Sequence, residues 1–363
     1  MTNRSKTRMI YIGRIPVGGD SPVTVQSMTN TDTRDSSSTI RQIKKLAEAG
    51  CDIIRVAVPD ITAARELPEI LEKSPIPVIA DIHFDYKLAL AAIDAGAAGI
   101  RINPGNIGDE KRVRAIAEAA GTKNIPIRVG ANAGSLSKEF LGKMKSKGTH
   151  HDGELAEALV KSALKECRVL EKFGFRKIKV SLKASSVPVT VMAYRKFSGE
   201  SDYPLHLGVT EAGTLIRGTI KSAVGIGTLL LDGIGDTIRV SLTADPIEEV
   251  KTGIMILEST GLRKAEPEIV SCPTCGRTEI DLMGLARKVE AEVEKIRKSG
   301  SKIKLKKIAV MGCVVNGPGE ARDADFGIAG ARKGRAAVFM KGKLKGIYPE
   351  AGALEMLRKE LEN

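Results

Sequence analysis

The chain has 363 residues, of which 42% are hydrophobic and 28% charged, a balance typical of a folded globular protein rather than a disordered one. No apolar run approaches the ~20 residues of a membrane span, and Met1–Met9 are polar with no apolar stretch behind them, so we expect a cytoplasmic protein. Lysine and arginine outnumber aspartate and glutamate by 57 to 44, and this net charge of +13 favours an anionic partner such as phosphate, nucleic acid or an acidic protein.

One structural unit repeats from residue 22 to about residue 262. In each repeat a short strand rich in Val and Ile is followed by a helical stretch, about every 25 to 40 residues. These strands are almost continuously apolar, as strands covered on both faces are. We predict eight of them, at Val23–Ser27, Asp52–Val58, Pro77–Ile82, Gly99–Asn103, Ile127–Gly130, Lys177–Leu182, Leu205–Val209 and Thr237–Leu242.

The alternation of strands and helices predicts an α/β fold. Eight such units favour a (β/α)8 TIM barrel, in which the strands close into a parallel sheet surrounded by helices. The alternative is an open, doubly wound sheet. That fold usually carries a glycine-rich fingerprint after its first strand, and none follows Val23–Ser27. Asp245 and Pro246 have the pattern of a helix start, with a capping side chain followed by proline at the first helical position.

The repeat stops near residue 262, where Gly261–Pro267 has the composition of a linker. We therefore predict two domains, a barrel over residues 1–262 and a smaller α+β domain over residues 263–363. The elements expected in the second domain are strands at Glu268–Ser271, Lys307–Met311, Phe326–Ile328, Ala336–Lys341 and Leu344–Tyr348, and helices at Asp281–Ser299 and from Glu350 onward.

Three of the five cysteines follow predicted strands of this second domain. Cys272 and Cys275 form a C-x-x-C motif, and 37 residues separate Cys275 from Cys313, which follows the next predicted strand. Two thiolates at the C-x-x-C spacing can share a metal centre, and the third can reach it across the domain. These residues favour an iron–sulfur cluster, whose open position Glu320 is placed to fill. The alternative is a structural zinc site, which four Cys or His ligands normally close, yet no histidine occurs after His206.

The remaining two cysteines fit the barrel core. Cys51 begins a strand, which places it at the end of the barrel away from the catalytic mouth, and Cys167 lies on the apolar face of a helix. We interpret both as buried, inert thiols.

Four predicted strands carry an arginine between aliphatic neighbours: Arg55, Arg101, Arg128 and Arg239. A buried arginine is costly unless it is paired or opens to the barrel mouth, where catalytic groups lie at the carboxyl ends of strands. Guanidinium groups bind phosphate oxygens in pairs, so these residues indicate a diphosphate or a similar polyanion. Alternatively, the arginines pair with internal acids as structural networks. Further polar side chains near the strand ends are Asp81, His83, Asn103, Asn132, Ser181, Lys183, Glu211 and Ser241.

Together these features closely resemble the 4-hydroxy-3-methylbut-2-enyl diphosphate synthase family of the non-mevalonate isoprenoid pathway. The resemblance covers nearly the whole chain. Its most specific segments are Val25-Gln26-Ser27-Met28-Thr29-Asn30-Thr31, Ser271-Cys272-Pro273-Thr274-Cys275-Gly276-Arg277 and Met311-Gly312-Cys313-Val314-Val315-Asn316-Gly317-Pro318-Gly319-Glu320. The resemblance implies the bacterial two-domain form, with a TIM barrel followed by an iron–sulfur domain that resembles a sulfite-reductase module.

The resemblance also assigns roles to residues. It implies a 4Fe–4S cluster held by Cys272, Cys275 and Cys313, with Glu320 on the fourth iron, and the substrate 2-C-methyl-D-erythritol 2,4-cyclodiphosphate. It gives Asp81, Glu211 and Glu320 catalytic roles. It implies diphosphate binding by Arg55, Arg101, Arg128, Asn132, Lys183 and Ser241. To these the strand pattern adds Arg239, Asn103 and His83 as further binding residues.

The implied reaction opens the cyclic diphosphate, removes a hydroxyl and takes up two electrons one at a time. It therefore needs an external donor, a ferredoxin or flavodoxin, and such acidic proteins would be attracted by a charge of +13. The family resemblance further implies a homodimer. Two alternatives are a pterin-binding methyltransferase-like barrel with a zinc ribbon, and an RNA-binding protein. The few aromatic residues, 3% of the chain, argue against the second.

Overall fold

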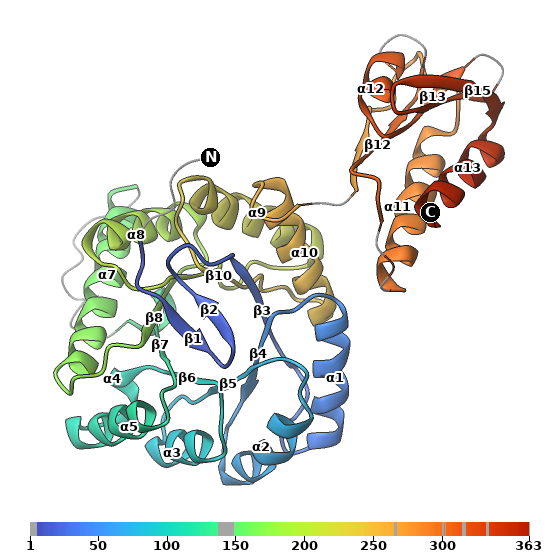
Figure 1. Cartoon of the computed structure of the whole chain (residues 1–363). Helices are drawn as coiled ribbons and strands as arrows, with labels where there is room; N and C mark the ends of the chain where they lie inside the picture. The colour runs from blue at the N-terminus through green and yellow to red at the C-terminus, as the bar shows by residue number, and fades with distance from the viewer. Residues whose placement is uncertain are drawn as a thin grey trace. The chain divides into compact units, whose positions relative to one another are not determined.

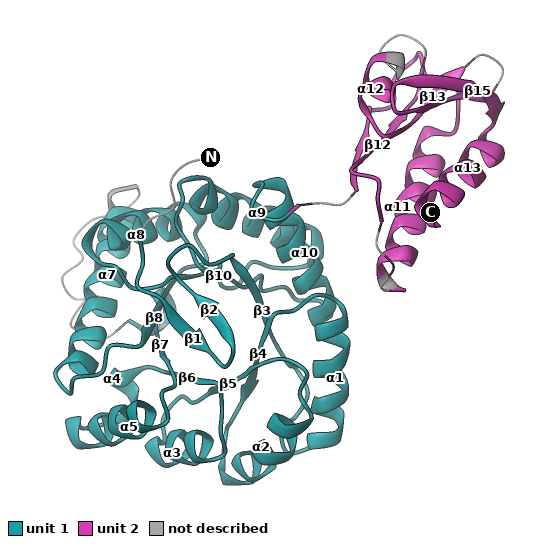
Figure 2. Ribbon diagram, viewed as in Figure 1, with its two compact units in different colours: residues 1–263 teal, residues 264–363 magenta. Residues whose placement is uncertain are grey.

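The chain forms two compact units, Met1–Arg263 and Lys264–Asn363, in a computed structural model that describes residues 6–136, 149–264, 267–299, 301, 303–313, 317–331 and 334–362 (Figure 2). The boundary between the units falls one residue after the one expected from the sequence. Each unit has its own buried apolar core, so each is described by itself below.

The first unit is a (β/α)8 barrel, as the sequence predicted, and not an open doubly wound sheet (Figure 1). Its strands form one parallel sheet in the order β8-β7-β6-β5-β4-β3-β10-β9, and a parallel bridge between Val180 and Leu205 joins the two ends. All eight predicted strands are confirmed, with ends displaced by a few residues. They are β3 (Thr24–Met28), β4 (Ile53–Ala57), β5 (Val78–Asp81), β6 (Gly99–Ile102), β7 (Ile127–Asn132), β8 (Ile178–Lys183), β9 (His206–Leu207) and β10 (Thr237–Ile238).

Helices surround this sheet because each has one apolar face that it buries against the strands. On α7 that face includes Leu159, Ala163 and Cys167, all fully buried. The Asp245 side chain accepts a hydrogen bond from the Ile247 amide at the start of α10, as its sequence pattern predicted. The helices are α1 (Ser36–Glu48), α2 (Ile61–Lys73), α3 (Tyr86–Asp94), α4 (Pro104–Ile107), α5 (Glu110–Thr122), α7 (Thr149–Glu171), α8 (Val187–Glu200), α9 (Leu215–Leu231) and α10 (Pro246–Ser259), with a 3-10 turn at η1 (Ala133–Ser135).

A hairpin that the sequence analysis missed precedes the barrel. Its strands β1 (Ile10–Ile12) and β2 (Ile15–Val17) pair antiparallel, and their apolar side chains pack on Ile53 and Ile79. Those two residues are near the start of β4 and β5, so the hairpin covers the amino-terminal end of the barrel on that side. Polar side chains lie instead at the carboxyl-terminal end of the barrel strands, where Asp81 ends β5 and Lys183 ends β8.

The second unit is a five-stranded sheet with helices on both faces. Its strand order is β11-β12-β13-β14-β15, with the first three strands parallel and the last two antiparallel to their neighbours. The strands are β11 (Glu268–Ser271), β12 (Lys307–Met311), β13 (Phe326–Ala331), β14 (Arg335–Met340) and β15 (Lys343–Pro349), and the helices are α11 (Leu282–Lys298), α12 (Gly317–Asp323) and α13 (Glu350–Glu362).

Two separate cores cover the two faces of this sheet. Residues of α11 and α13 pack on one face around Val289, Phe326 and Leu357. On the other face the short helix α12 places Ala321 against a smaller cluster that includes Met311. No helix was predicted from the sequence between β12 and β13, so α12 is a correction.

Candidate functional site

The buried arginines of the barrel point inward because side chains alternate along a strand. In β4 the neighbours Ile54 and Val56 are fully buried among the helices, which turns Arg55 toward the barrel axis. In the register of the sheet, Asp81 stands beside Arg101, and Arg101 stands beside Arg128. The register thereby brings residues of β5, β6 and β7 into one layer inside the barrel, and Arg55 of β4 reaches this layer through its side chain.

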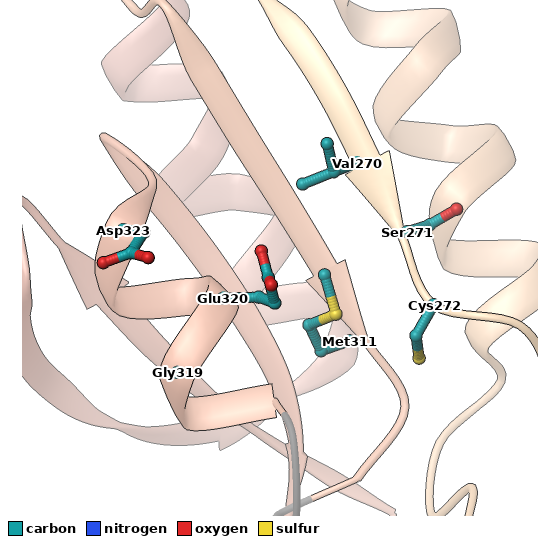
Figure 3. A pocket seen from close by; sticks show the side chains of 7 residues that line it. All are labelled: Val270, Ser271, Cys272, Met311, Gly319, Glu320 and Asp323. Carbon is teal, nitrogen blue, oxygen red and sulfur yellow. The ribbon is translucent and has the colours of Figure 1, made fainter.

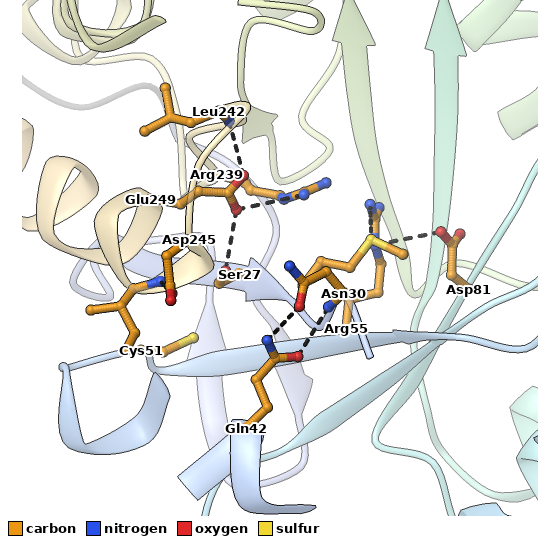
Figure 4. Close-up of polar contacts among 12 residues, drawn as sticks. Ser27, Asn30, Gln42, Cys51, Arg55, Asp81, Arg239, Leu242, Asp245 and Glu249 are labelled. Carbon is orange, nitrogen blue, oxygen red and sulfur yellow. Dashed lines mark hydrogen bonds and ion pairs between the residues drawn. The ribbon is translucent and has the colours of Figure 1, made fainter. Parts of the chain in front are cut away.

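Asp81 pairs with two of these arginines. Its Oδ2 lies 3.6 Å from Arg55 Nε (Figure 4). Its Oδ1 lies 3.3 Å from Arg101 Nη1. Burial alone would raise the pKa of Asp81, but the charges of Arg55 and Arg101 hold it well below its usual value. The ion pairs expected from the structural-network alternative are thus present for Arg55 and Arg101, whose guanidinium groups are both held by Asp81. Arg55 also donates to Met28 Sδ at 2.9 Å.

Arg128 forms no ion pair with a carboxylate of the described residues. It is 3% exposed, and its Nε and Nη1 atoms donate to nothing within the described part of the chain. Burial, followed by the charges of Arg55 and Arg101, lowers the pKa of Arg128 well below its ordinary value. Lys183 at the end of β8 is also buried, and its Nζ occupies the space beside Gly208, where a Cβ would lie 2.8 Å away. Burial and the charge of Arg128 lower the pKa of Lys183 as well.

The excess of positive charge in this layer is a physical reason to expect an anion. Desolvated cations without counter-charges are unfavourable, and a phosphate group would supply both charge and hydrogen-bond acceptors. Arg239 fits the same pattern, since its side chain is 17% exposed and its Nε donates to no described residue. The sequence-predicted arginines are thus assembled in one interior, open on the side where the strands end.

Other predicted mouth residues lie around this layer in different settings. His83 is half exposed, and its ring nitrogens lie 3.1 and 3.2 Å from Arg101 Nη1. Asn103 is buried, and its Oδ1 caps α4 by accepting from the Gly105 amide, which is a structural task the sequence analysis did not foresee. Glu211 is exposed in the loop after β9 and has a positive φ of 52°, a backbone conformation that costs energy for a residue with a side chain. Asn132 ends β7, and the half-buried Ser241 follows β10.

Two further buried polar groups of the barrel interior, Lys179 beside Arg128 in the sheet register and His206, were not predicted from the sequence. Lys179 and His206 face the barrel interior from β8 and β9, and both are essentially unexposed. His206 Nδ1 lies 2.7 Å from Thr237 Oγ1, whereas its Nε2 and Lys179 Nζ have no hydrogen-bond partner among the described residues. Burial lowers the pKa of both groups. Lys179 carried the same sequence signal as the arginines, a cation inside an aliphatic strand.

Another residue that the sequence analysis missed is Glu249, in the first turn of α10. It is 5% exposed, and its Oε1 accepts from the Leu242 amide at 2.9 Å. Its Oε2 lies 3.3 Å from Ser27 Oγ and 3.6 Å from Arg239 Nη2 (Figure 4). No periodic pattern marks it, because an acid in a first helical turn has an ordinary explanation as a partner of the helix dipole.

In the second unit, two of the three cysteines lie at the same edge of the sheet. Cys272 directly follows β11 and Cys313 lies two residues after β12, and these two strands are parallel neighbours. Cys272 Sγ accepts a hydrogen bond from the Gly312 amide at 3.2 Å. Gly330 allows this approach, since a Cβ there would lie 2.2 Å from the Gly312 carbonyl oxygen. Cys275 is exposed in a turn in which its amide donates to Thr278 Oγ1.

A pocket of about 670 Å³ lies beside Cys272, and Glu320 lines it from α12 (Figure 3). Glu320 is exposed, and its Oε2 is 3.8 Å from Lys307 Nζ. The remaining lining residues are Val270, Ser271, Met311, Gly319 and Asp323. The segment Val314-Val315-Asn316 of the third sequence motif lies outside the described residues.

The chemistry of these donors fits an iron–sulfur group. Soft thiolates are the ligands of such clusters, and amide hydrogen bonds to sulfur, like that of Gly312 to Cys272, are part of their environment. Over the described ranges, however, no three Cys, His, Asp or Glu side chains are close enough together to hold a single metal ion. Cys51 and Cys167 are buried in the barrel core, and burial raises the pKa of the Cys51 thiol to about 12.

Fold and site together define a class: a two-domain barrel protein with a barrel interior rich in buried cations and a cysteine-bearing second domain. The model of the GcpE TIM-barrel domain matches residues 7–254, and that of the GcpE protein C-terminal domain matches residues 268–363. The chain belongs to this family.

Full-length relatives give the same result. A protein of Clostridium acetobutylicum named 4-hydroxy-3-methylbut-2-en-1-yl diphosphate synthase (flavodoxin) is 56% identical and covers 99% of both chains. A Geobacter sulfurreducens protein of the same name is 54% identical over 99% of this chain and 98% of its own. The resemblance drawn from the sequence motifs is thereby confirmed.

Solved structures support the barrel and nothing finer. A dihydropteroate synthase from Coxiella burnetii has a TM-score of 0.50 at 12% identity, and covers 70% of this chain and 99% of its own. The corresponding Yersinia pestis enzyme has a TM-score of 0.50 at 11% identity, with 70% and 97% covered. Identities this low indicate a shared fold only. Among the described residues no helix combines the length and the apolar character that crossing a membrane requires.

Proposed function

We propose that this chain catalyses the reductive ring opening of 2-C-methyl-D-erythritol 2,4-cyclodiphosphate to 4-hydroxy-3-methylbut-2-enyl diphosphate, a step of non-mevalonate isoprenoid biosynthesis. The reaction takes up two electrons and releases the departing hydroxyl as water. The observation that carries this proposal is the layer of buried, partly unpaired cations at the barrel mouth, in a chain whose full-length relatives bear the name of that synthase.

In this proposal the arginine and lysine side chains of the barrel interior bind the diphosphate. Arg128, with two unused donor atoms, and Lys183 would contact phosphate oxygens most directly. Arg55 and Arg101 are held in place by the ionised Asp81, so they need little reorganisation when the anion enters. We assign Asn132, Ser241, Arg239, His83 and the amide nitrogen of Asn103 to the rim of the same site.

The three carboxyl groups assigned to catalysis, Asp81, Glu211 and Glu320, lie in different surroundings, and we assign them different roles. Asp81, with its depressed pKa, remains a carboxylate and acts by orienting Arg55 and Arg101. Glu211 is exposed at the mouth in a strained loop position, which suits a group that meets the substrate. Glu320, in the second unit, is the further carboxylate that we assign to proton delivery.

We propose that Cys272, Cys275 and Cys313 hold a 4Fe–4S cluster and that Glu320 binds its fourth iron. When bound, the cluster would supply single electrons and a Lewis acid for the leaving oxygen. The thiol of Cys272 is already oriented by the Gly312 amide, and Glu320 lines the pocket beside it. The carboxylate is the weakest partner in this set, because it is a hard ligand among soft thiolates.

The electron donor in this proposal is a flavodoxin or ferredoxin. The relatives carry the word flavodoxin in their names, and a net charge of +13 favours association with an acidic protein. We place the reaction in the cytoplasm, where a reducing environment keeps cysteine thiols available for metal binding.

A homodimer is also part of the proposal. One side of α9 exposes aliphatic residues at helical spacing, with Ile216 74%, Ile220 59% and Leu231 59% exposed. An apolar stripe of this kind is typical of a surface covered in an assembly. Ile220→Glu should therefore yield a monomer in sedimentation analysis, whereas an unchanged dimer would move the interface elsewhere.

The decisive experiment is anaerobic purification with reconstitution of iron and sulfide, followed by incubation with the cyclodiphosphate and a chemical reductant. We expect the open-chain diphosphate as product, and much slower product formation after Arg128→Met at a substrate concentration that just saturates the wild type. Zinc in place of iron and sulfide, or no product from fully loaded protein, would contradict the proposal.

A further inference from the structure

Glu249 lies at the seam between β3 and β10, where the first and the last barrel strand in the chain are neighbours. Ser27 belongs to β3, the first strand of the barrel, and Arg239 and Leu242 follow β10, the last one. These strands are parallel neighbours, with Ile238 opposite Val25. The Glu249 carboxylate reaches this seam from α10 and contacts both sides of it, through Ser27 Oγ and the Leu242 amide.

The first turn of α10 is held by a helix cap, which fixes the backbone from which the Glu249 side chain extends. Asp245 caps the helix through the Ile247 amide, and Pro246 occupies its first turn. Glu249 lies one turn from this cap and is 5% exposed. A carboxylate with this burial and this many contacts has few alternative rotamers.

The contacts of Glu249 lie on both sides of Ser241, at Arg239 before it and at the Leu242 amide after it. Arg239 and Ser241 are both assigned to the diphosphate site, and Glu249 holds the arginine by its guanidinium and the chain after Ser241 by the Leu242 amide. Glu249 Oε2 forms an ion pair with Arg239 Nη2 at 3.6 Å, and Arg239 Nε has no hydrogen-bond partner among the described residues. The guanidinium is therefore anchored through one terminal nitrogen while a second donor stays available for a ligand.

We infer that Glu249 is a positioning residue for the diphosphate site, acting through Arg239 and the Ser241–Leu242 backbone. This inference rests on the function proposed above. It goes further in assigning a role to a helix residue outside the strand-end pattern. Two possible roles of Glu249, neutralising the charge of Arg239 and positioning its side chain, predict opposite changes in the affinity for the anion. If the carboxylate merely neutralised Arg239, its removal would strengthen anion binding, whereas loss of positioning weakens it.

Glu249→Gln tests this with nearly unchanged volume. If the amide oxygen keeps the Leu242 contact, the amide nitrogen faces Arg239 with donor against donor. We expect the Kd for the cyclodiphosphate, measured by calorimetry on the cluster-loaded enzyme, to rise about tenfold, and kcat to stay within about twofold. Glu248→Gln is the matched control. It removes the same charge from the adjacent position, where Glu248 pairs with Lys251, and it should leave Kd unchanged.

A double variant tests whether Glu249 acts through Arg239. Arg239→Met should weaken binding by itself, and adding Glu249→Gln to it should cost little more, since the partner is already gone. Glu249→Asp keeps the charge but shortens the side chain, so it should give an intermediate Kd and serves if the glutamine variant fails to fold. Tighter binding in Glu249→Gln, an unchanged Kd, or additive effects in the double variant would overturn the inference. Absence of cyclodiphosphate binding by the wild type would instead refute the proposed function.

Discussion

The barrel mouth and the cysteine end of the second unit prepare their ligands in different ways. In the barrel, strand register places Arg101 between Asp81 and Arg128, and Asp81 also pairs with Arg55, before any ligand is present. In the second unit, Cys275 and Glu320 lie on a turn and a short helix, and a hydrogen bond from the Gly312 amide orients the sulfur of Cys272. A sheet can preorganise charges at a cost in stability, whereas metal ligands on loops gain order from the metal.

The largest effect should come from the cysteines, and it tests the second half of this comparison. Replacing Cys272, Cys275 or Cys313 with serine should abolish a cluster of about four irons per chain, and with it all activity, because thiolates are its protein ligands. Iron and sulfide analysis of anaerobically prepared protein measures this. Cys51→Ala and Cys167→Ala are the controls, since both thiols are buried in the barrel core. Loss of iron in either control would mean that the ligand assignment is wrong.

The fold was largely predictable from the sequence because the barrel strands are apolar on both faces and bounded by helices. Two elements were missed for physical reasons. The strands Ile10–Ile12 and Ile15–Val17 are too short to show a period. In α12, Gly317, Pro318 and Gly319 are weak helix formers, yet a proline is tolerated in a first turn and Ala321 gains burial against the sheet.

The next largest effect should come from Glu320→Gln, which separates ligand binding from chemistry. The thiolates should still assemble the cluster, and the barrel should still bind the cyclodiphosphate. If the carboxylate delivers a proton, turnover should fall by at least about 100-fold. Single-turnover product formation with a chemical reductant measures this without donor docking. A near-normal rate would remove Glu320 from the mechanism, and loss of the cluster would leave it a purely structural ligand.

The candidate site was only partly visible in the sequence. Arginine between isoleucine and valine breaks an aliphatic pattern, so Arg55 and Arg101 stand out in the amino-acid sequence alone. Glu249 does not, because its role arises when barrel closure brings β3 and β10 together, although Ser27 is 222 positions away in the chain. Long-range contacts of this kind leave no local signal. Asn103 is different, because its capping bond to the Gly105 amide is local, and asparagine followed by proline is the same helix-start pattern as Asp245 and Pro246.

Arg128→Met tests the first half of the comparison and should have a moderate effect. Removing a charge-assisted phosphate contact should weaken cyclodiphosphate binding by ~2 kcal/mol, or about 30-fold, with the cluster intact. Because Arg128 is buried with two unpaired donor atoms, the same change should raise the melting temperature of the ligand-free protein. Calorimetry and thermal unfolding measure the two effects. Unchanged affinity would mean that Arg128 has a structural role only.

The smallest effect concerns Glu166, a buried carboxyl of α7 whose Oε2 has no partner among the described residues. Burial raises its pKa from an ordinary 4.5 to about 8, with Arg101 opposing the shift. The folded state therefore holds a proton that the unfolded state releases between these values. Stability from this group is complete below about pH 4.5 and is lost as the pH rises toward 8.

Glu166→Gln removes this titration while keeping the shape of the side chain, so it isolates the cost of one unpaired buried carboxylate beside the cation layer. The variant should match the wild type near pH 5 and exceed its melting temperature increasingly up to pH 8, by a few degrees if the difference is about 1 kcal/mol. Melting curves of both proteins in parallel cancel the opposite contribution of His206, whose pKa burial lowers. A constant difference across this range would show that Glu166 does not titrate there. A lower melting temperature at pH 8 would show that its carboxylate is stabilised by Arg101 rather than penalised by burial.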